Sequence, residues 1–190
     1  EKLIYLSSTS VYGASSDMAN ESTLAVPRTF YGISKMRGEE HVMRFADKHE
    51  GLVFRAGNVY GFSKSMRFDA VINRFMYDAN FANRIKINGS GKQSRAFIQV
   101  DYLVDSLTKS VMKKIPSGTY NLVDKNLQIF DVVDVLKEMY PSLEFLFSNQ
   151  HMNLRELKVS RESQLYSYID RYEPRELKEE LVELRKKFSF

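Results

Sequence analysis

The segment Tyr31-Gly32-Ile33-Ser34-Lys35 places a phenol and an ammonium group one helical turn apart. Residues four apart share a face of a helix, so Lys35 can lie beside Tyr31. A nearby cation favours the phenolate form of a tyrosine, and a phenolate can take a proton from a substrate hydroxyl. Tyr31 is therefore a candidate general base, with Lys35 as the cation that supports it.

Spacing alone does not single out this pair, because Tyr60 and Lys64 are also four residues apart. Tyr31 opens an amphipathic pattern that is typical of a helix. Tyr60 is instead followed at once by Gly61, in what we predict to be a loop. We therefore favour Tyr31 and Lys35 as the proton-transfer pair.

Hydroxyl groups follow the first predicted strand, where the apolar run at 3–6 gives way to Ser-Ser-Thr-Ser at 7–10. In open α/β sheets, ligands bind at the carboxyl ends of the strands. A serine-rich segment considered alone more often caps a strand and begins a turn. Beside a general base, however, a hydroxyl at this strand end can hold the same substrate oxygen and stabilise the charge that develops on it.

Other patterns give no site. The Gly-Ser-Gly-Lys stretch at 89–92 lacks the earlier glycine and the following hydroxyl of a phosphate-binding loop, so we interpret it as a turn. No Gly-x-Ser-x-Gly elbow of a hydrolase occurs. The chain has no Cys, and its three His lack the usual zinc-ligand spacing, so we predict no metal site.

Hydrophobic spacing predicts an α/β fold. A helix over 29–49 lies between strands at 3–6 and 51–55 that are expected to be buried on both faces, which makes a parallel strand–helix–strand unit. Further helices are expected over 68–76, 101–114, 129–140 and 174–187, and strands over 84–87, 96–100, 118–123 and 143–147. The last helix is expected to hold Pro174 in its first turn, and residues 148–164 to form a surface loop.

Five segments occur in an order that is specific. They are Ser-Ser-Thr-Ser-Val-Tyr-Gly (7–13), Tyr-Gly-Ile-Ser-Lys (31–35), Arg-Ala-Gly-Asn-Val-Tyr-Gly (55–61), Arg-Ala-Phe-Ile-Gln-Val-Asp (95–101) and Gly-Thr-Tyr-Asn-Leu (118–122). Together they resemble the extended short-chain dehydrogenase/reductase family, the NAD-dependent epimerases and dehydratases of nucleotide sugars, of which UDP-galactose 4-epimerase is a familiar member. The resemblance runs from residue 1 to about 147.

The resemblance implies a fold: the second half of a doubly wound, Rossmann-type parallel sheet, interleaved with a small α+β substrate-binding lobe. Residues 1–61 are expected to form the C-terminal part of the dinucleotide-binding domain, with the Ser/Tyr/Lys catalytic segment. Residues 62–190 are expected to form mainly the substrate-binding lobe, with 101–123 returning to the Rossmann domain.

The resemblance also implies catalytic and cofactor-binding residues. The catalytic hydroxyl falls on Ser8, the base on Tyr31 and the lysine on Lys35. The cofactor, NAD or NADP, is expected to contact Ser7, Tyr31, Lys35 and Ala56, with Lys35 also holding its ribose.

For the substrate, a nucleotide-diphosphate sugar, the resemblance implies contacts from Ser8, Asn58 and Arg95. Asn58 is expected near the sugar and phosphate, although it could simply stabilise a turn. A guanidinium such as that of Arg95 suits a diphosphate, although Arg95 could also be a surface residue of a strand. Ala96 and Gln99 depart from the usual family pattern of Asp and His around this arginine.

The two residues after Ser8 limit the reactions that we expect of this chain. Nucleotide-sugar dehydratases that resemble this family carry Asp-Glu there as acid and base, whereas this chain has Thr9 and Ser10. Dehydration is therefore disfavoured, and we expect epimerisation or reduction through a keto intermediate.

The glycine-rich dinucleotide fingerprint occurs nowhere in the 190 residues. The first strand corresponds to the family's fifth, so the resemblance implies roughly 100 residues before Glu1. We expect the C-terminal portion of an NAD(P)-dependent nucleotide-sugar epimerase or reductase. The alternative is a catalytically inactive remnant that binds a nucleotide sugar or a protein partner. A homodimer or a complementing N-terminal fragment could cover the edge of the first strand.

Composition limits the partners further. The 28 Lys and Arg against 24 Asp and Glu leave a net charge of +4, too small and too mixed for a nucleic-acid partner. The longest apolar runs are far shorter than the roughly 20 residues of a membrane span, so no membrane partner is expected. Without cysteines, the chain is expected to be cytoplasmic.

Overall fold

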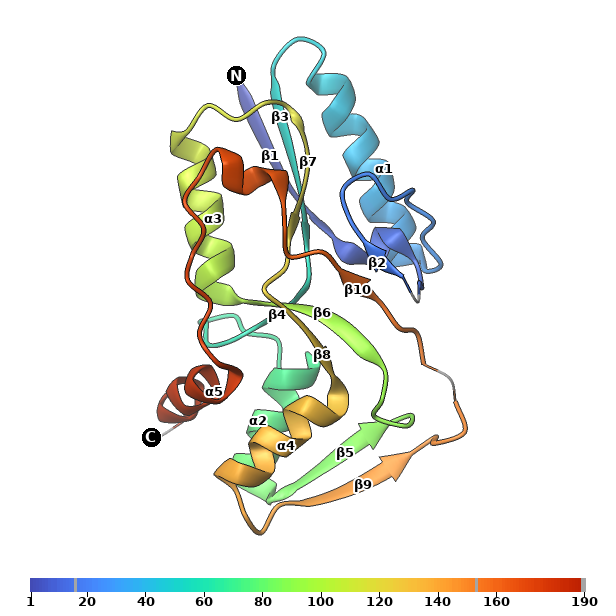
Figure 1. The fold of residues 1–190 in the computed structure, drawn as a ribbon, viewed down its shortest axis with the longest axis vertical. Coiled ribbons are helices and arrows are strands. Elements are labelled where there is room, and N and C mark those ends of the chain that lie inside the picture. Colours follow the sequence, from blue (N-terminus) through green and yellow to red (C-terminus); the bar gives the residue numbers. More distant parts are fainter. Residues whose placement is uncertain (16, 153, 189–190) are drawn as a thin grey trace.

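The computed structural model describes residues 1–15, 17–152 and 154–188. Strands and helices alternate along the chain, which confirms the predicted α/β class (Figure 1). The helices are α1 (Phe30–Phe45), α2 (Val71–Ala82), α3 (Val100–Met112), α4 (Ile129–Met139) and α5 (Leu177–Lys186), with 3₁₀ helices η1 (Thr9–Tyr12) and η2 (Gln164–Ser167). The strands are β1 (Lys2–Ser8), β2 (Met18–Ala19), β3 (Glu50–Ala56), β4 (Asn58–Tyr60), β5 (Arg84–Asn88), β6 (Ser94–Gln99), β7 (Gly118–Leu122), β8 (Lys125–Gln128), β9 (Glu144–Ser148) and β10 (Lys158–Val159).

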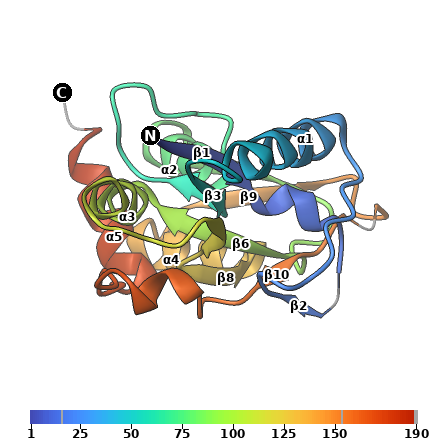
Figure 2. The ribbon, with the colours of Figure 1, turned by 90° about the horizontal axis from the view of Figure 1, so that it is seen from above.

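The central sheet is parallel and has the order β1-β3-β7. Side chains alternate between the two faces of a strand, and those of β3 separate accordingly. Leu52 and Phe54 belong to an apolar core shared with α3, whereas Arg55 pairs with Glu39 of α1. Helices α1 and α3 therefore cover opposite faces of the sheet (Figure 2).

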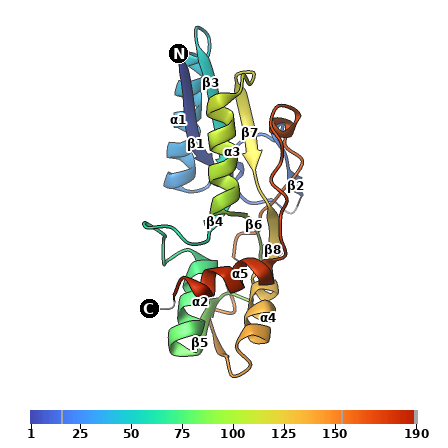
Figure 3. The same ribbon diagram turned by 90° about the vertical axis from the view of Figure 1, so that its left-hand side faces the viewer.

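A second region extends beyond the carboxyl ends of the central strands (Figure 3). Here β4 pairs with β6 in parallel and β6 with β8 in antiparallel, while β5 and β9 form a separate parallel pair. One apolar core joins the helices of this region. Phe75 and Met76 of α2, Leu136 of α4 and Leu181 of α5 all contribute to it, each at most 1% exposed.

The connections between the two regions are short. Gly57 alone separates β3 from β4, α3 follows β6 with no loop, and Val123 and Asp124 separate β7 from β8. A Cβ on Gly57 would lie 3.0 Å from the carbonyl oxygen of Ala96, so this glycine allows the end of β3 to approach β6 closely. The carboxyl ends of β1 and β3 therefore lie beside the second region.

β1 is less buried than the sequence predicts. A strand covered on both faces was expected, but Leu3 is 40% exposed and Leu6 is 38% exposed. β1 lies at the edge of its sheet and pairs only with β3 among the described strands. Its apolar side chains are half-exposed because no second strand flanks them in the described part of the chain.

Tyr60 itself lies in a strand, and the loop that was predicted after it begins at Gly61. Tyr60 ends β4, is 2% exposed, and donates a hydrogen bond to Glu180 of α5. Residues 148–164 are not simply a surface loop, because they contain β10, which pairs with β2 and buries Val159 completely. β10 was missed because a distant segment, β2, supplies its pairing contacts.

Two element boundaries also differ. Val100, expected in a strand, is the first residue of α3, because the Gln99 side chain caps the helix there. α5 begins at Leu177, so Pro174 precedes the helix and does not lie in its first turn.

Candidate active site

Helix α1 begins where the sequence provides a cap. Thr29 is its N-cap residue, and the Thr29 Oγ1 accepts a hydrogen bond of 3.0 Å from the backbone N–H of Gly32. The cap fixes the first turn, which carries Tyr31, and Lys35 follows one turn later. Tyr31 is 54% exposed, so its side chain is open to a ligand.

Gly32 lets the start of α1 approach the end of β1. A Cβ at this position would lie 2.9 Å from the carbonyl oxygen of Ser10 and 3.0 Å from the Cβ of Pro27. No side chain fits there unless one of these neighbours shifts. The glycine therefore brings Tyr31 beside the hydroxyls that follow β1.

Ser8 ends β1 and caps η1. Its Oγ accepts a hydrogen bond of 3.1 Å from the backbone N–H of Ser10 and lies 2.6 Å from the Ser10 Oγ. Both hydroxyls line the same cavity as Tyr31. Ser8 is thus held in one orientation, and Ser10, which we did not predict as a site residue, is its direct partner.

Lys35 lies between β1 and Tyr31. Its Nζ donates a hydrogen bond of 3.0 Å to the carbonyl oxygen of Leu6. The same Nζ is 5.1 Å from the ring centroid of Tyr5 and 5.7 Å from that of Tyr31. An ammonium group at this distance lies within cation–π range of the ring, and the structure brings Tyr31 and Lys35 together.

A buried ion pair joins α1 to the sheet one turn beyond Lys35. Glu39 is 5% exposed and accepts hydrogen bonds from Arg55 of β3, the shortest being 2.7 Å from Nη2 to Oε2. Burial lowers the pKa of Arg55, but its interactions with Glu39 and Tyr12 together outweigh burial and raise the pKa. Ser7 Oγ donates to the same carboxylate at 2.5 Å. The structure thus places the Ser7 hydroxyl under α1, on the opposite face of β1 from Ser8.

The fit to a nicotinamide cofactor is partial. Lys35 and the exposed Tyr31 supply the polar groups that a cofactor ribose needs. The side chain of Ala56 packs in the core beneath α3 and is 4% exposed, and the Ser7 hydroxyl is occupied by Glu39. The chain thus fits the nicotinamide end of the cofactor through α1, and the glycine-rich fingerprint for the pyrophosphate does not occur in its 190 residues.

Asn58 and Arg95 come from neighbouring strands. Asn58 begins β4 opposite Phe97 of β6, and its Nδ2 donates a hydrogen bond of 2.9 Å to the carbonyl oxygen of Ala96. Arg95 lies on β6, where burial lowers the pKa of its guanidinium. No carboxylate among the described residues forms an ion pair with Arg95, which leaves the guanidinium available to an anionic ligand.

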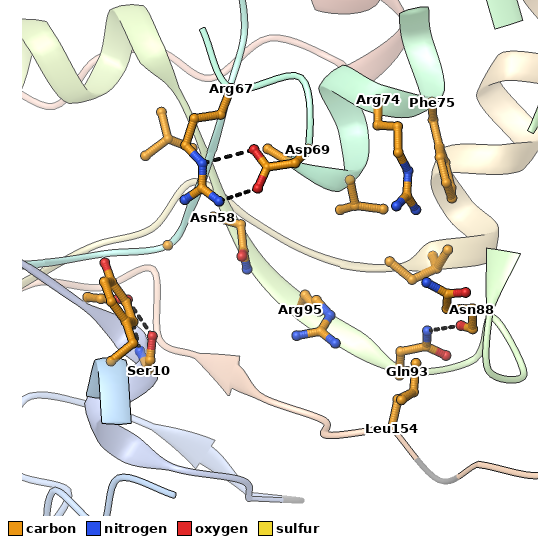
Figure 4. A pocket seen from close by; sticks show the side chains of 17 residues that line it. Ser10, Asn58, Arg67, Asp69, Arg74, Phe75, Asn88, Gln93, Arg95 and Leu154 are labelled. Atoms are coloured by element: carbon orange, nitrogen blue, oxygen red, sulfur yellow. Dashed lines mark hydrogen bonds and ion pairs between the residues drawn. The ribbon is translucent and has the colours of Figure 1, made fainter. Parts of the chain in front are cut away.

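One cavity of about 510 Å³ collects these side chains (Figure 4). In this view Ser10 lies toward one end, Arg95 near the centre and Gln93 toward the other end. The volume is within the range of small-molecule sites. Asp69 is the only carboxylate that lines the cavity in the described ranges, and it forms an ion pair with Arg67.

Sequence reasoning missed two further arginines. Arg74 of α2 lines the main cavity, and Arg155 lines an adjoining cavity of about 70 Å³ together with Ser8 and Arg95. In both, the buried Nε has no hydrogen-bond partner in the described part of the chain. Burial, and then the charges of Arg95 and Arg28, lower the pKa of Arg155. No motif in the sequence singled out either arginine.

The described residues offer neither a metal-binding cluster nor a membrane-spanning helix. Within residues 1–15, 17–152 and 154–188, no three acidic or histidine side chains gather in a way that could hold a metal ion. Over the same ranges, no helix combines the length and the apolar character that crossing a bilayer requires.

Sequence comparisons find relatives among nucleotide-sugar enzymes. Residues 1–122 match the NAD dependent epimerase/dehydratase family. The human dTDP-D-glucose 4,6-dehydratase is 29% identical over 155 residues, which are 80% of this chain and 43% of the human protein. The mouse enzyme is 30% identical over 142 residues, 73% of this chain and 39% of its own length. The chain thus spans less than half the length of these curated relatives.

Solved structures share the fold. A UDP-glucuronic acid 4-epimerase variant from Bacillus cereus, in complex with a fluorinated UDP-glucuronic acid and NAD, has a TM-score of 0.87 at 20% identity, covering 98% of this chain and 60% of that one. An NAD dependent NDP-hexosamine 5,6-dehydratase of tunicamycin biosynthesis has a TM-score of 0.85 at 22% identity, covering 97% and 62%. One is an epimerase and the other a dehydratase, so the fold does not choose between these reactions.

The sequence match, unlike the fold, identifies the family of the chain. The match covers 122 of the 190 residues and includes both the strand end at Ser8 and the start of α1. The fold agrees with it over almost the whole chain. This chain therefore belongs to the NAD-dependent epimerase/dehydratase family.

Proposed function

We propose that the chain carries the proton-transfer and substrate-binding part of an NAD(P)-dependent nucleotide-sugar epimerase or reductase. The proposal rests on one observation: Tyr31 and Ser8 line the same cavity as Arg95. A nucleotide sugar needs a general base at its sugar and a cation at its diphosphate, and the lining of this cavity includes both.

At the sugar, Tyr31 and Ser8 act on one oxygen. The Tyr31 Oη takes the proton of the sugar hydroxyl, and the Lys35 ammonium supports the phenolate. The Ser8 Oγ holds the same oxygen and is itself oriented by Ser10. The bound nicotinamide supplies the redox chemistry by accepting or returning a hydride.

At the diphosphate, the first turn of α2 assists Arg95. Its N-cap residue, Ala70, has no side-chain cap, so backbone N–H groups at this helix start are not used by a capping side chain. Ala70 and Val71 line the cavity, as does Arg74. Helix N-termini and guanidinium groups are the usual partners of phosphate oxygens.

The side chains after Ser8 favour epimerisation or keto reduction over dehydration. Water elimination from a sugar needs an acid and a base beside the reacting carbon. Thr9 and Ser10 stand where the related dehydratases carry Asp-Glu, and Ser10 lines the cavity with Ser8. Asp69 lies across the cavity in an ion pair with Arg67.

Replacing Tyr31 by Phe tests the proposal. We expect Tyr31→Phe to lower kcat for a UDP- or dTDP-sugar by about a hundredfold or more, because the general base is lost. The measurement is turnover by the protein as its gene encodes it, with NAD or NADP added. Ser34→Ala, which removes an exposed hydroxyl of the same helix, is the control and should keep its activity.

Undiminished turnover in Tyr31→Phe would refute the role of Tyr31. A protein that binds UDP or dTDP but turns over no sugar, with either cofactor, would support the alternative, an inactive chain that only binds nucleotide sugars.

A further inference from the structure

We propose that Tyr5 is a positioning residue of the candidate active site, because the face of its ring holds the Lys35 ammonium beside Tyr31. The inference rests on the proposed function and adds to it a residue that lies outside the five segments of the family resemblance. It follows from the groups that surround the Lys35 Nζ and from the way the Tyr5 ring packs against α1.

The Lys35 ammonium is surrounded by aromatic rings and a carbonyl oxygen. None of the ion pairs in the described part of the chain includes Lys35. Its Nζ donates a hydrogen bond of 3.0 Å to the carbonyl oxygen of Leu6. The centroid of the Tyr5 ring is 5.1 Å from the same Nζ, closer than the 5.7 Å to the Tyr31 ring. Tyr5 and the Leu6 carbonyl group therefore determine where the ammonium lies.

An aromatic ring attracts an ammonium group without neutralising it. The attraction comes from the negative face of a ring that carries no net charge. A carboxylate in the same place would pair with the lysine and offset its effect on the neighbouring phenol. Tyr5 thus fixes the position of the ammonium and leaves its whole charge to support the phenolate form of Tyr31.

The Tyr5 ring is itself held between β1 and Gly38 of α1. Tyr5 lies two positions before Ser7, so both side chains point to the face of β1 that α1 covers. A Cβ on Gly38 would lie 2.5 Å from the Cζ of Tyr5 and closer still to its Oη, so the ring lies directly on the helix backbone. Gly38 comes three residues after Lys35, which places the ring and the ammonium on one face of α1.

Proton NMR of the 190-residue chain tests the contact. The face of an aromatic ring shields the protons above it, so the ε-methylene protons of Lys35 should resonate upfield of those of the exposed lysines. In Tyr5→Leu this upfield shift should shrink, because leucine removes the ring and keeps an apolar side chain. Tyr5→Phe keeps the ring and should keep the shift.

Turnover by the protein as its gene encodes it tests the positioning role. With a UDP- or dTDP-sugar and saturating NAD or NADP, we expect Tyr5→Leu to lower kcat about fivefold, the usual size of one cation–π contact. The KM for the nucleotide sugar should not change, because Arg95 and Arg74 lie elsewhere in the cavity and remain in place. Tyr5→Phe should keep the kcat of the unchanged protein.

Phe145→Leu is the matched control. Phe145 lies on β9, and the Nζ of Lys137 in α4 is 5.5 Å from the centroid of its ring. This variant therefore also removes a strand aromatic that faces a helical lysine, but neither residue lines the cavity. It should keep its kcat. Thermal unfolding of every variant sets the temperature below which turnover is compared.

The outcomes separate this inference from the proposed function. Full turnover in Tyr31→Phe would refute the general base, and with it the proposed function. If Tyr31→Phe is inactive but Tyr5→Leu keeps its kcat, or keeps the upfield shift of Lys35, only the positioning role of Tyr5 is overturned. That role also fails if Tyr5→Phe loses as much activity as Tyr5→Leu, because the hydroxyl and not the ring would then matter.

Discussion

Gly32 determines how closely the general base can approach the hydroxyl that works with it. Tyr31 is carried on the first turn of α1 and Ser8 on the last residue of β1, so their separation depends on the contact between these two segments. That contact is made across Gly32, with the Ser10 carbonyl oxygen on one side and Pro27 on the other. A single hydrogen atom in place of a side chain thus decides whether the site can form.

We expect Gly32→Ala to destabilise the chain by about 1–3 kcal/mol, the usual cost of overpacking, because the Ser10 backbone must move. Urea unfolding followed by circular dichroism measures this change. Gly118→Ala is the control, since a Cβ there would lie 3.6 Å from the Tyr120 Oη, an ordinary van der Waals distance. If both variants unfold at the same urea concentration, Gly32 does not set the contact.

The sequence could place site residues side by side where they lie close together along the chain. Tyr31 and Lys35 share a helix, so four positions along the chain are enough to place them together. Arg74 and Arg155 could not be found in this way. They come from a helix and from a segment predicted as a loop, and only the folded chain brings them to the cavity of Arg95.

The orientation of α1 on the sheet depends on a buried charge pair. Glu39 and Arg55 have side chains that are 7% and 10% exposed, and Ser7 gives the carboxylate a third donor. Removing one partner of such a pair leaves an uncompensated charge in the interior. Because Lys35 lies one turn from Glu39, the same pair also fixes the lysine over β1.

Glu39→Gln should therefore lower the free energy of unfolding by about 3–5 kcal/mol. The neighbouring Glu40 provides a control, because it forms an ion pair with Arg37 on the exposed face of the same helix. Glu40→Gln should leave the unfolding midpoint nearly unchanged. Equal midpoints for the two variants, in thermal unfolding at pH 7, would contradict a structural role for the Glu39 charge.

Helices and strands were predicted well where apolar residues recur at regular spacing, and their first and last residues were predicted poorly. The helical spacing of apolar residues predicts α1, α2 and α4, because each of these helices buries one face. It does not give β4 or β10, which are short and are stabilised by pairing with β6 and β2. The beginning of α5 at Leu177 was missed because a proline suggested an earlier start.

At the scale of the whole molecule, Glu180 holds the last helix to the rest of the chain. Its carboxylate accepts hydrogen bonds of 2.5 Å from the hydroxyls of Tyr60 in β4 and Tyr102 in α3, and lies 3.0 Å from Lys125 in β8. Burial, together with the bond to Glu180, raises the pKa of Tyr102 to about 12. Burial likewise raises the pKa of Tyr60.

These shifts predict a loss of stability at high pH. An unfolded tyrosine titrates near 10, so the stabilisation from a neutral Tyr102 is complete below pH 10 and is lost as the pH rises through about 12. The urea midpoint should therefore fall between these values. The fall should be smaller in Tyr102→Phe, which has no phenol to ionise. An identical fall in both proteins would show that other groups cause it.

The whole molecule was the least predictable scale. The α/β class and the first parallel strand–helix–strand unit follow from the sequence. Both depend on the local spacing of apolar residues and on one short connection. The cavity depends on how the second region is placed against the central sheet. That placement is made by contacts between segments more than 30 residues apart, such as Asn58 with Ala96, and no local pattern reports them.

β6, the strand that carries Arg95, continues directly into α3, the helix that covers one face of the central sheet. Gln99 fixes the connection between β6 and α3, because its side chain accepts hydrogen bonds from the backbone N–H groups of Asp101 and Tyr102. The strand that carries Arg95 is thus joined to α3 without an intervening loop. The other two links between the regions are held as well, because the backbone N–H groups of Gly57 and Asp124 donate hydrogen bonds of 3.0 and 2.8 Å to the carbonyl oxygens of Leu122 and Phe97.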